Sequence, residues 1–211
     1  MSREQILHKV RTALGRTAGQ AVADPPPVRL RVSEMDLETR VATLLQNVEA
    51  LAGKIRRVAT GEAARAYVGS VLGGKSAVAS NAPFLRECGI ADLAGVQSGF
   101  TGAPELRALC AIADIGITSA DYALADTGTL VMLSSPQEAR MISLLPPVHI
   151  AVVPQERVLT GLDELLTILP HPAEQTSSMV LITGPSRTAD IEQILVRGVH
   201  GPREIHVVVV G

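Results

Sequence analysis

The strongest constraint on the fold of this 211-residue chain is an alternation of short apolar runs with helical patterns, which begins near Ile55 and continues to Gly211. Several runs are continuously apolar, HIAVVP at 149–154 among them. Such runs are typical of strands buried on both faces of a parallel sheet. The expected strands are 55–59, 76–80, 114–119, 129–135, 149–154, 178–184 and 204–211, and the expected helices between them are 62–72, 105–113, 162–169 and 189–198. The pattern predicts an α/β fold, a three-layer sandwich with a mainly parallel sheet.

The first 34 residues follow another pattern. Ser2 and Gln5 match a capping box, and Ile6, Val10 and Leu14 continue at helical spacing. Residues 16–34 include three consecutive prolines and no period, which indicates a linker. We therefore expect an N-terminal helix at 1–15, a Pro-rich linker at 16–34 and one α/β domain at 35–211, whose first helix begins near Ser33. A short helix is marginal alone in water, so its apolar stripe needs a partner: its own chain by default, another copy or another protein.

Charge and composition exclude several classes of function. The net charge is −2, so no basic field favours nucleic acid, and four aromatic residues give few stacking surfaces. Cys88 and Cys110 stand apart without a CxxC pair, and the histidines lack metal-ligand spacing, so we expect no metal or iron–sulfur centre in this chain. No run reaches the length of a membrane span, and the N-terminus is amphipathic rather than signal-like. These features favour a cytoplasmic protein. They indicate no particular cofactor.

Polar residues between two apolar runs make 117–132 the first candidate site. Thr118 ends one run, and the turn Asp126–Thr129 leads into the next. Asp126 is a candidate proton-transfer group, while the hydroxyls of Thr127 and Thr129 beside the Gly128 backbone would orient a small polar substrate. The alternative is a turn in which Asp and Gly serve only the backbone geometry.

Two further segments carry candidate residues. In LITGPSRTADIE at 181–192, a strand, a loop and a helix start are expected to bind an anion; the alternative is a well-capped helix. The turn before the last strand holds His200, a candidate acid–base group or a surface histidine. His149 opens a strand and is either a ligand contact or a buried histidine bonded to backbone. The substrate-binding candidates outside the first segment are Arg140, His149, Thr183, Gly184, Ser186 and Arg187.

Taken in order, ADTGTLV, RMISLLPPVHIAVVP, ITGPSRTADIE and GVHGP resemble the LUD-domain family, its lactate utilization C type in particular. The similarity covers roughly residues 35–211, and the N-terminal helix and linker fit the family layout. The resemblance implies a fold like the NagB/RpiA/CoA-transferase superfamily. It also implies a role in oxidising L-lactate to pyruvate beside two partner subunits with iron–sulfur clusters. Motif positions carry over onto Asp126–Thr129, Arg140, His149, Thr183, Gly184, Ser186, Asp190, Glu192 and His200–Pro202; the family often has Glu where this chain has Asp126.

Two functions of different class follow from these expectations. In the first, the three loops converge at the carboxyl ends of the strands on a small carboxylate, which Arg140 or Arg187 clamps, and Asp126 or His200 moves a proton. In the second, the chain is a non-catalytic assembly subunit whose N-terminal helix docks partners. We favour an accessory or substrate-binding subunit of a lactate-oxidising system. A stand-alone CoA-transferase-like or isomerase-like enzyme, acting on a small carboxylate or a sugar phosphate, is the alternative, and the sequence leaves room for a homo-oligomer.

Overall fold

A computed structural model describes residues 2–20, 35–191 and 194–211. Contacts divide the chain into two units, residues 1–31 and 32–211. In the first unit, helix α1 (Arg3–Ala13) begins with the expected capping box: the Gln5 amide donates to Ser2 Oγ at 3.3 Å, and the Ser2 amide donates to Gln5 Oε1 at 2.9 Å. Among the described residues no helix is long and apolar enough to cross a membrane.

The second unit is built on a six-stranded sheet in the order β1-β12-β7-β4-β2-β3, in which all neighbouring strands are parallel. The bounds are β1 Lys54–Val58, β2 Ala77–Ala79, β3 Val96–Gln97, β4 Ile115–Ser119, β7 Val148–Pro154 and β12 Glu204–Val210. The central strand β7 is buried along almost its whole length, which explains its continuous apolar run. The predicted α/β fold with a mainly parallel sheet is confirmed.

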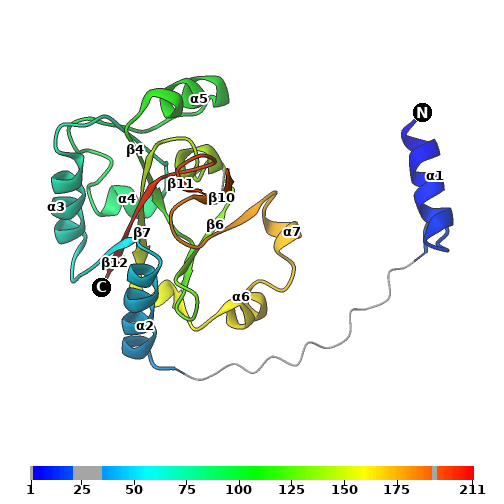
Figure 1. The fold of residues 1–211 in the computed structure, drawn as a ribbon, viewed down its shortest axis with the longest axis horizontal. Helices are drawn as coiled ribbons and strands as arrows, with labels where there is room; N and C mark the ends of the chain where they lie inside the picture. The colour runs from blue at the N-terminus through cyan, green and yellow to red at the C-terminus, as the bar shows by residue number, and fades with distance from the viewer. Residues whose placement is uncertain (1, 21–34, 192–193) are drawn as a thin grey trace. The chain divides into compact units, whose positions relative to one another are not determined.

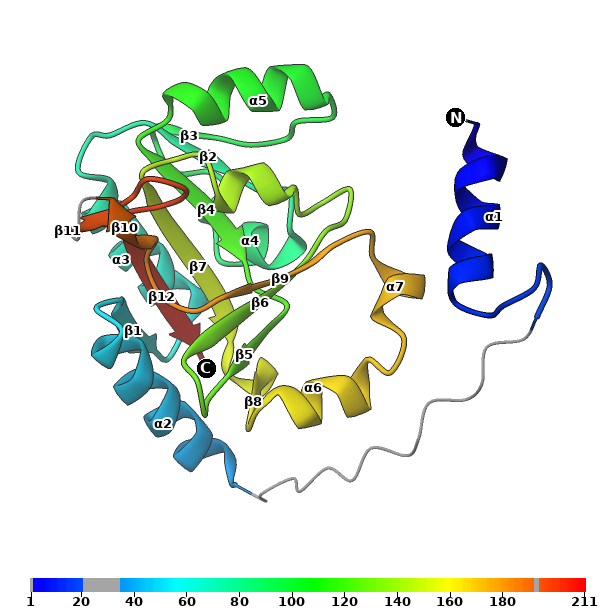
Figure 2. The same ribbon diagram turned by 45° about the vertical axis from the view of Figure 1, so that its right-hand side comes forward.

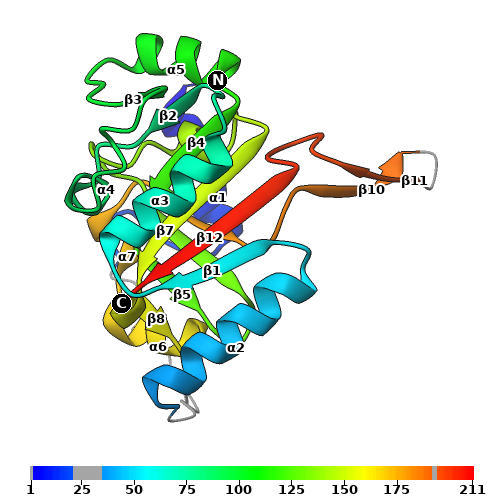
Figure 3. The same ribbon diagram turned by 90° about the vertical axis from the view of Figure 1, so that its left-hand side faces the viewer.

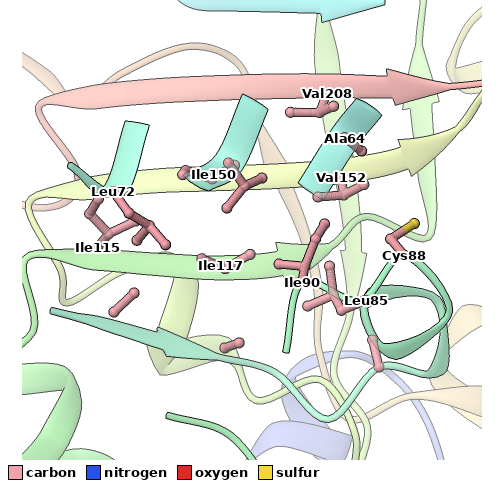
Figure 4. Packing of buried hydrophobic residues seen from close by; sticks show 14 of the residues in the cluster. Ala64, Leu72, Leu85, Cys88, Ile90, Ile115, Ile117, Ile150, Val152 and Val208 are labelled. Carbon is pink, nitrogen blue, oxygen red and sulfur yellow. The ribbon is translucent and has the colours of Figure 1, made fainter. Parts of the chain in front are cut away.

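One face of this sheet packs on helices α3 (Gly61–Leu72) and α4 (Pro83–Glu87). Ile117, Ile150 and Val208 lie under Ala64 and Leu72 in a shared hydrophobic cluster (Figure 4). Burying each of the larger side chains stabilises the fold by about 1.5–3 kcal/mol. Helix α5 (Ala103–Ile112) and the 3-10 turn η1 (Arg140–Ser143) pack in a smaller cluster around Val78, on the opposite face of the sheet from Ala77 and Ala79.

The other face differs from the expected layer of helices. Beside α5 and η1, it packs on α2 (Leu37–Ala50) and on a second sheet of order β8-β5-β6-β9. The bounds of this sheet are β5 Tyr122–Leu124, β6 Thr129–Leu133, β8 Val158–Leu159 and β9 Met179–Ile182, and only the β5–β8 pair is parallel. The expected strands 129–135 and 178–184 therefore belong to a mostly antiparallel sheet. Figure 1 shows α3, the parallel sheet and β6 in succession, with α6 (Leu162–Ile168) and α7 (Pro172–Gln175) beyond them, and Figure 2 shows the second sheet turned forward.

The helix expected at 189–198 was a wrong prediction. Strand β10 (Arg187–Ile191) pairs antiparallel with β11 (Ile194–Arg197) in a two-stranded sheet of its own. Figure 3 shows the two strands extending away from the body beyond the beginning of β12. A short hairpin, rather than a helix, thus follows the loop 183–186.

Candidate functional site

The clearest pocket lies where β2, β4 and β7 end. Its volume is about 360 Å³, and it is lined by Phe84, Ser119, Asp121, Gln137, Glu138 and Arg157 together with small residues between them. The carboxyl ends of parallel strands are the place where open α/β sheets bind ligands. The volume suits a small molecule.

The loop after β6 brings Glu138 into this pocket. Ser135 Oγ accepts hydrogen bonds from the amides of Gln137 at 3.2 Å and Glu138 at 3.0 Å, which closes a tight turn. The amide of Asn81, just after β2, donates to the carbonyl of Gln137 at 2.8 Å. These contacts fasten the loop to the carboxyl end of the parallel sheet and turn the Glu138 side chain inward.

Glu138 is a buried acid, with 6% of its surface exposed. Its Oε2 accepts from Ser80 Oγ at 2.7 Å and from the Ser119 amide at 3.2 Å, whereas its Oε1 is buried and has no hydrogen-bond partner in the described part of the chain. Burial raises the pKa of Glu138 to about 8, the negative charge of Asp121 adds to the rise, and the two hydrogen bonds oppose it. The side chain is therefore mostly a neutral acid at pH 7.

Asp121 and Arg157 supply the charges of the pocket. Asp121 Oδ2 accepts from the Leu133 amide at 2.6 Å, and burial raises the pKa of Asp121 while the positive charge of Arg157 opposes the rise. The Arg157 guanidinium lies 5.3 Å from the centroid of the Tyr122 ring. Within residues 2–20, 35–191 and 194–211 it makes no hydrogen bond or ion pair, so it is available to an anionic ligand.

The structure brings four of the predicted site residues together elsewhere, at the β5–β6 turn. Thr127 Oγ1 donates to Asp126 Oδ1 at 3.1 Å, and Thr129 Oγ1 donates to Thr127 Oγ1 at 2.9 Å. The hydroxyl oxygens of Thr129 and Thr183 are hydrogen-bonded at 2.8 Å. The Asp126 carboxylate also packs on Gly161, where an added Cβ would lie 2.4 Å from Oδ2. These residues form one hydroxyl–carboxylate chain between β6 and β9.

This turn is also packed against the end of α2. Asn47 Nδ2 donates to the carbonyls of Ala125 at 2.7 Å and Asp126 at 3.0 Å. Gly128 has a φ of +65° and lies so close to α2 that a Cβ would meet the Asn47 carbonyl carbon at 3.0 Å. The Arg187 guanidinium donates to the carbonyl of Leu51, and Gly184 packs on the same residue. These contacts match the structural alternative, in which the turn packs on α2 and Arg187 caps the carboxyl end of that helix.

The remaining predicted residues are spread over other places. The Ser186 amide donates to the Pro202 carbonyl at 2.8 Å, and the Arg203 amide donates to the Pro147 carbonyl at 3.0 Å. His200 is exposed in this loop, which enters β12 at its amino end and not at the carboxyl ends where convergence was expected. Arg140 is exposed at the start of η1. Glu192 lies outside the described residues. Ser186 and His200 thus belong to loops that meet before the amino end of β12, and neither lines the pocket at the carboxyl ends of the strands.

Thr118 and His149 lie inside the protein. Both are fully buried on adjacent strands β4 and β7, and Thr118 Oγ1 lies 2.7 Å from His149 Nε2. Burial lowers the pKa of His149 to about 4, so the imidazole is neutral at pH 7. The partner of the buried histidine is thus a threonine hydroxyl, not the backbone.

Metal ligands do not gather in the part of the chain that the structure describes: no group of three or more His, Cys, Asp or Glu side chains could hold an ion. Cys88 and Cys110 are buried in different hydrophobic clusters, and burial raises the pKa of both thiols.

Sequence reasoning missed Glu138 and Arg157. Glu138 sits in SSPQEAR, a polar segment that reads as a surface loop, and Arg157 sits in a similar segment after β7. A Ser–x–x–Glu spacing from Ser135 was the only local signal. Asp121 could be identified from the sequence, because it follows the apolar run that forms β4 and so lies at the end of a strand.

Comparisons with known proteins agree on the relationship. Residues 41–210 match the sequence profile of the LUD domain. Lactate utilization protein C of Halalkalibacterium halodurans is 44% identical over 102 residues, 46% of this chain and 44% of that protein. Its counterpart in an Exiguobacterium species is 41% identical over 108 residues, 49% of this chain and 47% of that protein. These two alignments span less than half of each relative.

A longer alignment joins this chain to lactate utilization protein C 1 of Bacillus mycoides, 28% identical over 219 residues that cover 95% of this chain and 93% of that protein. The crystal structure of a DUF162 family protein from Deinococcus radiodurans has the same fold, with a TM-score of 0.66 at 20% identity over 84% of this chain and all of that one. Because the profile match spans most of its length, the chain belongs to the LUD domain family.

Proposed function

We propose that this chain is a subunit of an L-lactate utilization system and that it binds a small carboxylate in the pocket at the carboxyl ends of β2, β4 and β7. The names of its relatives support the lactate role. The observation that carries the binding role is Arg157, which has no hydrogen bond or ion pair among the described residues and lies at the rim of a pocket of about 360 Å³ that also holds a buried acid. The alternative of a stand-alone CoA-transferase-like enzyme gains no support from these relatives.

Arg157 is the residue that pairs with the ligand carboxylate. A guanidinium presents several N–H donors in a plane, which suits the two oxygens of a carboxylate. Its contact with the Tyr122 ring orients the side chain and leaves those donors free. Ser119 and Gln137 at the pocket wall add polar groups for the remainder of the ligand.

The chain acts in this proposal as an accessory or substrate-binding component. Partner subunits with iron–sulfur clusters would accept the electrons released when L-lactate becomes pyruvate, and the complex would be cytoplasmic. Purification of the tagged chain from cells grown on lactate tests the partnership: two iron-containing proteins in the eluate would support it, and recovery of this chain alone would contradict it.

The loop site predicted from sequence stays a second proposal. Its carboxylate is Asp126 and its hydroxyls belong to Thr127, Thr129 and Thr183, while its histidine, His200, lies in the loop before the amino end of β12. The variants Asp126→Asn and His200→Gln distinguish a catalytic role of these loops from a structural one. A loss of lactate-dependent growth with an unchanged melting temperature would favour catalysis at the loops, whereas a lowered melting temperature with normal growth would favour a structural turn.

Calorimetric titration of L-lactate and pyruvate tests the pocket. Arg157→Met should weaken binding by about tenfold to a hundredfold, because charge-assisted hydrogen bonds contribute about 1.5–3 kcal/mol. Arg56→Met is the matched control: Arg56 is also exposed and lies over a tyrosine ring, that of Tyr67, at 5.8 Å, but does not line the pocket. Equal affinities of the two variants would overturn the assignment.

A further inference from the structure

We infer that Glu138 binds an anion in the pocket as a neutral acid, donating a hydrogen bond from its free carboxyl oxygen, so that ligand and proton are held together. The ligand class is a small oxyanion with an acceptor oxygen beside its charged group, such as a 2-oxo or 2-hydroxy carboxylate. The choice of L-lactate and pyruvate as ligands rests on the proposed function, whereas the behaviour of Glu138 rests on its own contacts.

The two carboxyl oxygens of Glu138 have different surroundings. Oε2 already accepts from two donors, Ser80 Oγ and the Ser119 amide. A proton on Oε2 would point at these donors, so the acid proton belongs on Oε1. That oxygen is buried and has no partner among the described residues. An unpaired buried polar group is costly. Because Glu138 lines the pocket, a ligand whose acceptor oxygen reaches Oε1 would remove that cost.

The charged groups around Glu138 are of both signs, and its neutral form is favoured by burial and by Asp121. The loop after β4 contributes Asp121, whose negative charge raises the pKa of Glu138. The turn after β7 contributes the Arg157 cation at the pocket rim, and η1 contributes Arg140 beside a small neighbouring cavity that Glu138 also lines. A ligand anion paired with Arg157 adds a second negative charge to the pocket. Ionised Glu138 would then repel both the ligand and Asp121.

Proton linkage follows with a definite sign. Below pH 8 Glu138 is already protonated, and affinity for the anion is independent of its titration. Above pH 8 the free protein must take up a proton before it binds, so affinity falls by up to about tenfold for each pH unit. Near pH 9 binding should therefore take up close to one proton.

The experiment is calorimetric titration of the full chain with L-lactate, pyruvate, acetate and inorganic phosphate from pH 6 to pH 9.5, in pairs of buffers with different ionisation enthalpies. We expect wild-type affinity to be level up to about pH 8 and to fall beyond it, with proton uptake measured near pH 9. Glu138→Gln keeps N–H donors without a titrating proton and should bind with level affinity throughout. Glu105→Gln, an exposed glutamate on α5, is the matched control and should behave as wild type.

Each result bears on one proposal or both. Lactate or pyruvate binding with no fall above pH 8 and no proton uptake overturns the role of Glu138 and leaves the proposed function standing. Proton-linked binding of acetate or phosphate alone supports Glu138 and contradicts the lactate assignment. No binding of any of the four anions overturns both. Proton uptake is measured on the wild-type chain, so the test holds even if Glu138→Gln does not fold.

Discussion

Replacing Glu138 by glutamine should change how stability depends on pH. In the folded protein the pKa of Glu138 is about 8, well above the ordinary value of 4.5, because burial disfavours the charged form. Between these values the folded state holds a proton that the unfolded chain has released, so wild-type stability falls as pH rises from about 4.5 to about 8. At about 1.4 kcal/mol for each pKa unit, the shift corresponds to about 5 kcal/mol in the free energy of unfolding.

Urea denaturation of the wild type and of Glu138→Gln at pH 5, 7 and 9 measures this effect. Titrations of other groups occur in both proteins and cancel in the difference between their free energies of unfolding. Glutamine keeps an oxygen that can accept from Ser80 and Ser119, so the two proteins should be closest at pH 5. By pH 9 the variant should have gained several kcal/mol on the wild type. A difference that stays constant from pH 5 to pH 9 would refute the argument that Glu138 is buried as a neutral acid.

Three further substitutions test packing contacts outside the pocket by urea denaturation. Gly116→Ala should destabilise by about 1–3 kcal/mol or more, because a Cβ there would lie 2.0 Å from the Ile142 carbonyl oxygen; unchanged stability would contradict the packing of η1 on β4. Asn47→Ala should cost about 1–3 kcal/mol, since it removes the donor of two hydrogen bonds to the β5–β6 turn, and a neutral effect would argue against that docking. Tyr67→Phe should cost about 1 kcal/mol by removing the hydroxyl 2.8 Å from Nδ1 of buried His206, whereas a stabilised variant would contradict that contact.

The parallel sheet was predictable because its pattern is local. Strand β7 is covered on both faces, so its apolar run identifies it as a central strand. The second sheet was not predictable in the same way: TLVML in β6 is equally apolar whether its neighbours run parallel or antiparallel. In the 187–197 segment, Ile191, Ile194 and Leu195 match a helical spacing, yet the chain forms paired strands there. Tertiary pairing overrides a short local pattern of this kind.

The candidate site residues also fall into those that the sequence predicted and those that it did not. The hydroxyl chain from Asp126 to Thr183 is part of the predicted set, because its residues flank apolar runs in the sequence. Glu138 is different, since its buried state depends on Ser80, which lies 58 positions away, and on the Ser119 amide, 19 positions away. Sequence position shows that an acid follows a strand. The packing of distant loops is what buries this acid and raises its pKa, so that it stays protonated near neutral pH.

Chemical-shift mapping of the ¹⁵N-labelled chain with L-lactate and pyruvate tests the central claim most directly, because it reports where a small carboxylate binds. The account predicts ligand-dependent shifts for the amides of Ser119, Asp121, Gln137 and Arg157, reduced in Arg157→Met and retained in Arg56→Met. Shifts confined to Asp126–Thr129 and to the loop at His200, with none at the carboxyl ends of β2, β4 and β7, would contradict it.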